Sequence, residues 1–281
     1  MNRRRFLGLC AAGGVAAAGA WTVHDIHSER FSLRVNRRRL RVHGLPASLE
    51  GLKIALLSDF HAGWCTPWDL ATRAAVLAVG EKPDLIFLLG DYVSDPVAAV
   101  AAPLRKVLAA LRAQHGVWAV LGNHDWMYGR HRPVIQSLAA TGATLLRNSA
   151  RRLSIRGHDL WLAGLDDPVT ERDNFEAALR DVPSGALTFL LAHTPDIIYQ
   201  AEQLGLRAVF AGHTHGGQVC IPFYGPPIVP SKFGKRFASG AFTVRGTSMY
   251  VTRGIGSVPP LVRFNCPPEV SLLTLAAQTR S

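Results

Sequence analysis

The chain has 281 residues, 48% of them hydrophobic, with 31 Lys or Arg against 20 Asp or Glu. This length and apolar content exclude an intrinsically disordered chain and fit one large domain or two small ones. The formal net charge of +11 indicates an anionic partner, which could be nucleic acid, acidic lipid headgroups or a phosphorylated substrate. Four cysteines without C-x-x-C spacing argue against a disulfide scaffold.

Residues 1–20 are typical of an export signal. Arg3, Arg4 and Arg5 precede a run of Ala, Gly and Leu that extends to Ala20, and residues 18–20 form an A-x-A cleavage candidate. The paired arginines resemble a twin-arginine signal, which predicts export by the twin-arginine translocation machinery to the periplasm or the membrane surface. An uncleaved membrane anchor is an alternative, and a basic helix belonging to the fold is disfavoured by the glycines.

Residues 21–50 form a basic region. From Phe31 to Val42, apolar residues alternate with arginines, which predicts a half-exposed strand or hairpin with a cationic outer face. Residues 51–281 then predict a single domain with two facing sheets.

Within this domain, short apolar runs alternate with segments of helical spacing, as in α/β proteins. Helices are predicted at residues 66–79, 97–112 and 172–180, and a strand at 160–165. The last third indicates short antiparallel strands at 218–221, 241–244, 248–251 and 270–273. Buried strands are predicted at 54–57, 85–89, 117–121, 188–191 and 208–211.

A short polar block follows each of the five buried strands. Because ligands bind at the carboxyl ends of strands in open α/β sheets, the blocks are expected to converge. They contain the carboxylate, imidazole and amide ligands that divalent ions prefer, in a number sufficient for two ions. Asp59 and His61 would lie on the same side of an extended D-x-H segment, and Asp91 is the natural bridge. The blocks are Ser58-Asp59-Phe60-His61, Gly90-Asp91-Tyr92, Gly122-Asn123-His124-Asp125, Ala192-His193-Thr194 and Gly212-His213-Thr214-His215.

In this order, the blocks resemble those of the calcineurin-like metallophosphoesterase superfamily. The resemblance implies a four-layer α/β/β/α sandwich of two mixed sheets. It also implies two divalent metal ions, for which manganese is the first candidate and zinc, iron or magnesium are alternatives. One ion would be held by Asp59, His61, Asp91 and His215, and the other by Asp91, Asn123, His193 and His213. His124 would face the substrate without binding metal.

Two differences from the motifs of other members of the superfamily argue against two of its subclasses. Purple acid phosphatases have a tyrosine ligand where this chain has Ser94, and protein phosphatases have G-N-H-E where this chain has Asp125. The D-F-H and G-H-T-H-G-G-Q blocks are more similar to the bacterial phosphodiesterase group that includes YaeI, YkuE and LpxG.

The predicted reaction is hydrolysis of a phosphodiester or pyrophosphate bond by metal-activated hydroxide. His124 is the candidate general acid, with Asp125 as its orienting partner, or alternatively an electrostatic stabiliser. The remaining histidines are assigned to core or turn positions, namely His24, His27, His43, His115, His131 and His158.

Residues 60–68 are rich in aromatic side chains, and residues 218–236 combine aromatic and apolar side chains with Lys232, Lys235 and Arg236. This composition favours an anionic membrane surface as partner and a lipid-linked substrate such as a UDP-diacylglucosamine-like molecule. Packing of these aromatic residues onto the core is the alternative. Other hypotheses are an exported nuclease, a cyclic-nucleotide phosphodiesterase, or a metal-binding scaffold without turnover. A nuclease would lose binding steeply with added salt.

Overall fold

The computed structural model describes residues 28–278. The predicted signal over residues 1–20 therefore lies outside the described residues, as do His24 and His27. Export stays a prediction. No helix between residues 28 and 278 combines the length and apolar character needed to cross a membrane.

The first sheet has six strands in the order β1-β12-β2-β3-β4-β5. β1 and β12 pair in parallel, β12 pairs antiparallel with β2, and the remaining pairs are parallel. The strands are β1 (Arg34–His43), β12 (Glu269–Gln278), β2 (Lys53–Leu57), β3 (Leu85–Leu88), β4 (Val117–Ala119) and β5 (Thr144–Leu145).

The second sheet also has six strands, in the order β10-β11-β9-β8-β7-β6. Its central strands β11, β9, β8 and β7 run parallel, and an antiparallel strand closes each edge. The strands are β6 (Ser149–Ile155), β7 (His158–Gly164), β8 (Thr188–Leu191), β9 (Ala208–Ala211), β10 (Gly240–Val244) and β11 (Thr247–Val251).

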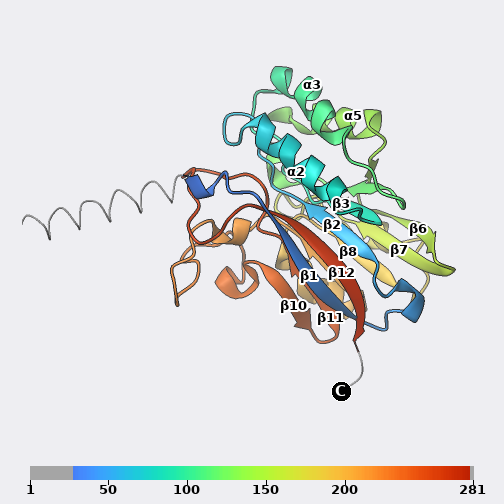
Figure 1. Ribbon diagram of the computed structural model, residues 1–281. Coiled ribbons are helices and arrows are strands. Elements are labelled where there is room, and N and C mark those ends of the chain that lie inside the picture. The colour runs from blue at the N-terminus through green and yellow to red at the C-terminus, as the bar shows by residue number, and fades with distance from the viewer. Residues whose placement is uncertain (1–27, 279–281) are drawn as a thin grey trace, which may run out of the picture.

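Helices cover the outer face of each sheet, so that the fold has four layers. α2 (Trp68–Gly80), α3 (Val97–Leu108) and α5 (His131–Ala140) lie together on the first sheet, as Figure 1 shows. The shorter α6 (Phe175–Leu179) and α7 (Ile198–Gln203) pack on the second. Short 3₁₀ turns occupy Ala47–Leu49, Met127–Gly129, Pro195–Ile197, His215–Gly217 and Gly234–Phe237.

The alternation of side chains along a strand explains this layering. In β2, Ala55 and Leu57 pack toward the helices, whereas Ile54 and Leu56 pack between the two sheets. Because both faces of such a strand are buried, its sequence is a continuous apolar run. The predicted α/β/β/α sandwich of two mixed sheets is confirmed.

The amino-terminal strand prediction is also confirmed. In β1, Leu40 and Val42 are buried while Arg39 and Arg41 are exposed. The strand lies at the edge of its sheet, where exposed cations hinder pairing with another chain.

Several expectations for the last third were wrong. Residues 218–221 form no strand and make only isolated bridges, through Val219 and Ile221. The antiparallel pairing is correct for β10 with β11 and for β12 with β2, but β11 and β12 each also have one parallel neighbour, because long connections return them beside β9 and β1. In the middle of the chain, the helix predicted at 172–180 is confined to α6.

Candidate metal centre

The fold brings the predicted ligands to the same place from both sheets. β2, β3 and β4 run parallel in the first sheet, and β8 and β9 in the second, so the polar blocks emerge at matching strand ends. A hydrogen bond joins the two sheets at this place, since His193 Nδ1, after β8, donates to the carbonyl of Leu89, after β3, at 2.7 Å.

One group of potential ligands contains Asp59, His61 and His215, all buried. The Nε2 atoms of His61 and His215 lie 3.2 Å apart, and His215 Nε2 is 3.5 Å from Asp59 Oδ1. Both histidine Nδ1 atoms are buried without a hydrogen-bond partner in the described chain. Protein contacts therefore leave the tautomers of these two rings unfixed.

A second group contains Asp91, His193 and His213. His193 Nε2 lies 3.2 Å from His213 Nδ1 and 3.1 Å from the amide oxygen of Asn123. Asn123 belongs to α4 (Asn123–Trp126), the short helix that follows β4. The seven predicted ligands thus form two adjacent groups, and their binding of metal remains a prediction.

Asp91 connects the groups. Its Oδ2 lies 3.5 Å from His61 Nε2 and 3.2 Å from His193 Nε2, so a single oxygen faces both. Its Oδ1 accepts a hydrogen bond of 2.8 Å from the His124 backbone N–H. One oxygen is thereby fixed by the chain, and the other is directed between the histidines.

The geometry around His193 fits a bound cation. Its Nδ1–H donates to the Leu89 carbonyl, so in a neutral His193 ring Nε2 carries a lone pair and no proton. When the neighbouring groups are in the form that binds metal, all three atoms that face Nε2 are also acceptors. They are Asp91 Oδ2, Asn123 Oδ1 and His213 Nδ1. Such a set of acceptors repels unless positive charge lies among them. Carboxylate, amide and imidazole atoms together are suitable ligands for a divalent metal.

The pKa values of the buried histidines and of Asp91 also indicate that positive charge is needed among these groups. Burial alone would lower the pKa of His193, but the Asp91 carboxylate outweighs it and raises that pKa to about 10. Burial would raise the pKa of Asp91, yet His193 holds it well below its usual range. Burial lowers the pKa of His61 to about 3 and that of His213 to about 4. In the metal-free chain, a proton on His193 therefore occupies the place of a cation.

The ligand loops have an unusual backbone. φ is positive at five ligands, where non-glycine residues are rare. Such conformations cost of order 1–3 kcal/mol each and cluster at functional sites. The expected extended D-x-H segment is therefore wrong. Asp59 and His61 share a group because the chain turns at both residues. The angles are 52° at Asp59, 41° at His61, 57° at Asp91, 69° at His213 and 51° at His215.

His124 and Asp125 occupy different environments. The half-buried His124 ring lies edge-on to His61, with centroids 4.7 Å apart. Asp125 is fully buried and accepts hydrogen bonds from the backbone N–H groups of Asp91, Tyr92 and Gly122 at 2.8–2.9 Å. Burial and the nearby Asp91 charge raise the pKa of Asp125 to about 7. These contacts make Asp125 a positioning residue for the Asp91 loop, instead of the expected partner of the His124 ring.

Sequence reasoning missed the segment that supports Asp59. The N–H of Gly256 donates to the Asp59 carbonyl at 2.6 Å, and a Cβ on Gly254 would lie 2.7 Å from Asp59 Cβ. The buried Arg263 guanidinium donates to the carbonyls of Arg253 and Cys266, which holds this segment in place. In the sequence, the closely spaced Gly254 and Gly256 could have indicated that this segment approaches another part of the backbone.

The histidines expected outside the site lie outside the two groups where the structure describes them. His131 stacks on Trp126 with centroids 4.4 Å apart, and His158 Nδ1 contacts the Ser48 hydroxyl at 2.6 Å. His43 and His115 also belong to neither group.

The two mixed sheets and the two groups of candidate ligands are those expected of a metal-dependent phosphoester hydrolase. Residues 52–217 match the family described as calcineurin-like phosphoesterase. The chain belongs to this family, whose members typically bind divalent metals.

Three relatives match nearly the whole chain. The chain is 34% identical to the uncharacterized metallophosphoesterase YkuE of Bacillus subtilis, over 98% of each chain. It is 31% identical to the phosphodiesterase YaeI of Escherichia coli, over 98% of this chain and 99% of YaeI. It is 26% identical to the UDP-2,3-diacylglucosamine pyrophosphatase LpxG of Chlamydia trachomatis, over 88% of this chain and 90% of LpxG. The predicted family and group are confirmed.

Because the pKa of His193 is about 10, metal uptake by the metal-free chain at pH 7 should release ~1 proton from this ring. The apparent affinity should fall about tenfold for each pH unit below the pKa, since protons compete with metal for Nε2. Titration calorimetry in buffers of different ionisation enthalpy measures the proton count. His213→Gln should weaken binding but leave the count unchanged, because His213 is already neutral at this pH. A count near zero in the unsubstituted protein would contradict the prediction.

Proposed function

We propose that this protein hydrolyses a phosphodiester or pyrophosphate bond in an amphipathic, lipid-linked substrate, with two divalent metal ions at the candidate centre. Manganese is the first ion to test, followed by zinc, iron and magnesium. The observation that carries the substrate class is a pair of pockets, one beside His213 whose mixed lining includes three carboxylates, and one beside His215 whose lining is mostly apolar.

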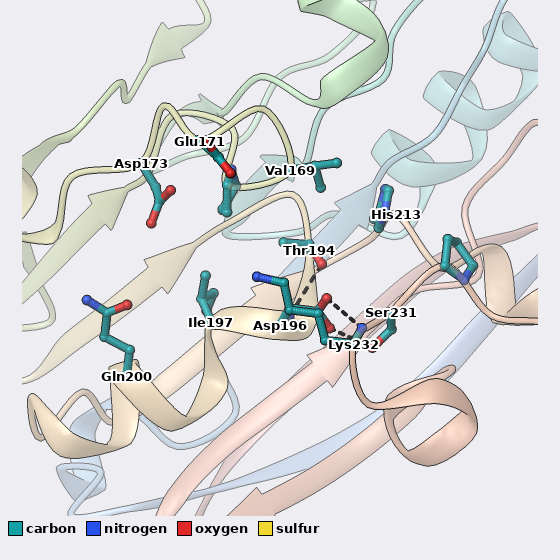
Figure 2. Close-up of a pocket in the computed structure, with 12 residues that line it drawn as sticks. Val169, Glu171, Asp173, Thr194, Asp196, Ile197, Gln200, His213, Ser231 and Lys232 are labelled. Carbon is teal, nitrogen blue, oxygen red and sulfur yellow. Dashed lines mark hydrogen bonds between the residues drawn. The ribbon is translucent and has the colours of Figure 1, made fainter.

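The pocket beside His213 has a volume of about 520 Å³, and its lining combines carboxylates with apolar side chains such as Val169 and Ile197. Its walls come from the loop after β7, the segment after β8, and residues 230–232, as Figure 2 shows. Glu171 and Asp173 line one side, and Asp196 binds the Ser231 hydroxyl and the Lys232 N–H on the other. Carboxylates of this kind can accept hydrogen bonds from sugar hydroxyls.

The pocket beside His215 is apolar and has a volume of about 380 Å³. Gln218, Val219, Ile228 and Val258 are among the residues that line it. The Gln218 side chain is held against Val258 by two hydrogen bonds. Its Nε2 donates to the Val258 carbonyl, and its Oε1 accepts from the Val258 N–H. An acyl chain is the natural occupant of such a surface.

Together, the pockets suit a substrate whose phosphate lies at the centre between a polar headgroup and an acyl chain. A UDP-diacylglucosamine-like molecule has this form. The similarity to LpxG, named as a pyrophosphatase of UDP-2,3-diacylglucosamine, supports the same class.

The bound ions would supply a hydroxide near neutral pH and neutralise charge on the phosphoryl group. The chain supplies the remaining parts. Asp91 Oδ2 faces both groups of ligands, and Asp125 fixes the backbone that carries it. The His124 ring, half-buried beside His61, would donate a proton to the leaving oxygen.

Replacing Asp91 by Ala should remove both ions, because its Oδ2 faces a histidine of each group. Elemental analysis of the purified variant measures the loss. Asp159→Ala, which removes an exposed carboxylate on β7, should retain the metal content of the unsubstituted protein. Retention of two ions per chain in the Asp91 variant would refute the bridging assignment.

His124→Ala should retain the metals but lower turnover by ~10²–10⁴, the usual contribution of a positioned proton donor. The loss should be smaller for substrates with acidic leaving groups such as nitrophenol, which need no proton. Equal losses on good and poor leaving groups would instead indicate electrostatic stabilisation. Loss of metal would place His124 among the ligands.

A substrate panel tests the proposed function directly. Metal-reconstituted protein is assayed on UDP-diacylglucosamine in detergent, on UDP-N-acetylglucosamine, on a nitrophenyl diester and on an oligonucleotide. We expect the highest kcat/KM on the acylated pyrophosphate. Val258→Ser should lower that value about tenfold, because apolar contact with the chain is lost, and should not alter hydrolysis of the nitrophenyl diester. Equal rates on the acylated and unacylated nucleotides, or preference for the oligonucleotide, would exclude the lipid-linked class.

A further inference from the structure

The loop that follows the G-H-T-H-G-G-Q block exposes large apolar side chains to an unusual extent. Backbone hydrogen bonds between Ile221 and Gly225, at 3.0 and 2.8 Å, close its tip into a tight turn. The tip is therefore a defined structure that presents its side chains outward. The exposed fractions are 44% at Ile221, 112% at Phe223, 58% at Tyr224 and 79% at Ile228.

Phe223 argues against simple packing of this loop on the core. An aromatic residue that fixes a loop would be buried, but this side chain is fully exposed. Its φ is 64°, an unfavourable value for a bulky residue. The described part of the chain offers no apolar contact that compensates for either cost. Both features suit a residue that enters an apolar phase outside the protein.

The surroundings of the tip are cationic. Residues 218–236 contain Lys232, Lys235 and Arg236 and no Asp or Glu, and the nearby Asp196 carboxylate is occupied by the Ser231 hydroxyl and the Lys232 N–H. Lys235 lies over the Tyr224 ring at 4.2 Å. Lys232 and Arg236 are exposed in the same segment, and Arg236 lies over the Phe237 ring at 5.2 Å. Exposed apolar side chains surrounded by cations complement an anionic lipid surface. A soluble polyanion would use the cations but not the aromatic tip.

The tip is also continuous with the proposed site. Ile228 is largely exposed and at the same time lines the apolar pocket beside His215. A chain leaving a bilayer at this loop would thus reach the candidate centre without crossing water.

We propose that residues 221–228, together with Lys232, Lys235 and Arg236, dock this protein on an anionic lipid bilayer, with Phe223 inserted at the headgroup boundary. Delivery of substrate through the apolar pocket rests on the proposed function, whereas docking does not. The two can therefore fail separately.

The experiment is sedimentation of the full chain with vesicles of equimolar phosphatidylcholine and phosphatidylglycerol. Phe223→Asn should bind at least tenfold more weakly, since Asn tolerates the left-handed backbone while removing the aromatic ring. Val76→Asn, at an exposed valine on α2, is the matched control and should bind normally. Lys235→Gln should weaken binding to these vesicles, and Lys106→Gln on α3 should not. Hydrolysis of a nitrophenyl diester should be unchanged in Phe223→Asn, because Phe223 lines neither pocket.

Amide hydrogen exchange locates the contact independently of residues 1–20. Added vesicles should protect the amides of residues 221–228 and leave those of α2 unchanged. Equal vesicle binding by Phe223→Asn and the unsubstituted chain, or absence of protection at 221–228, would overturn the proposal. Binding to dextran sulfate but not to vesicles would also overturn it and indicate a polyanion as the partner. Vesicle binding without diester hydrolysis would refute the proposed function and leave docking intact.

Discussion

The Asp91 carboxylate is the group on which the site depends. Both oxygens have fixed surroundings, since Oδ1 accepts from the His124 N–H and Oδ2 faces His61 and His193. Its backbone is fixed as well, because Asp125 accepts from the Asp91 N–H while also holding Gly122. Burial raises the pKa of Asp125, and repulsion by the nearby Asp91 carboxylate raises it further. The positive charge on His193, or on metal in its place, stabilises the arrangement.

The rigid sandwich makes this crowded centre possible. Glycines allow the loops to approach, since a Cβ on Gly122 would lie 2.3 Å from Asp91 Oδ1 and one on Gly212 would lie 2.1 Å from Ser58 Oγ. Each ligand loop is attached to a strand buried on both faces, such as β2 or β9. Strain in the loops is therefore balanced by apolar burial in the strands, and ligand positions do not depend on flexible surface segments.

The sequence predicted the central strands and the ligand groups because both have strong local signals. Apolar runs such as residues 85–89 match buried strands closely, and each polar block follows at a strand end. The last third was less predictable. β11 and β12 have sequences suited to either strand direction, and their parallel neighbours β9 and β1 are distant in the chain. The left-handed turns at Asp59 and His61 gave no local signal, because both residue types are common in extended segments too.

The role of Asp125 shows a related limit. Adjacent positions suggested that it orients His124, but the first turn of a helix directs successive side chains in different directions. Its carboxylate instead accepts backbone N–H groups from two loops, a contact between segments that sequence order cannot reveal.

One short stretch, residues 213–232, connects chemistry with recognition. It supplies His213 and His215 to the two groups of ligands, and it contributes a wall to both pockets. Pro230 lines both pockets, so the carboxylate-containing pocket and the apolar pocket share a boundary. Because the exposed loop lies within the same stretch, contact of the loop with a lipid surface would fix the orientation of the pockets relative to that surface. Length and composition of this stretch can therefore alter the preferred substrate while the ligand loops, held by the sheets, keep the same chemistry.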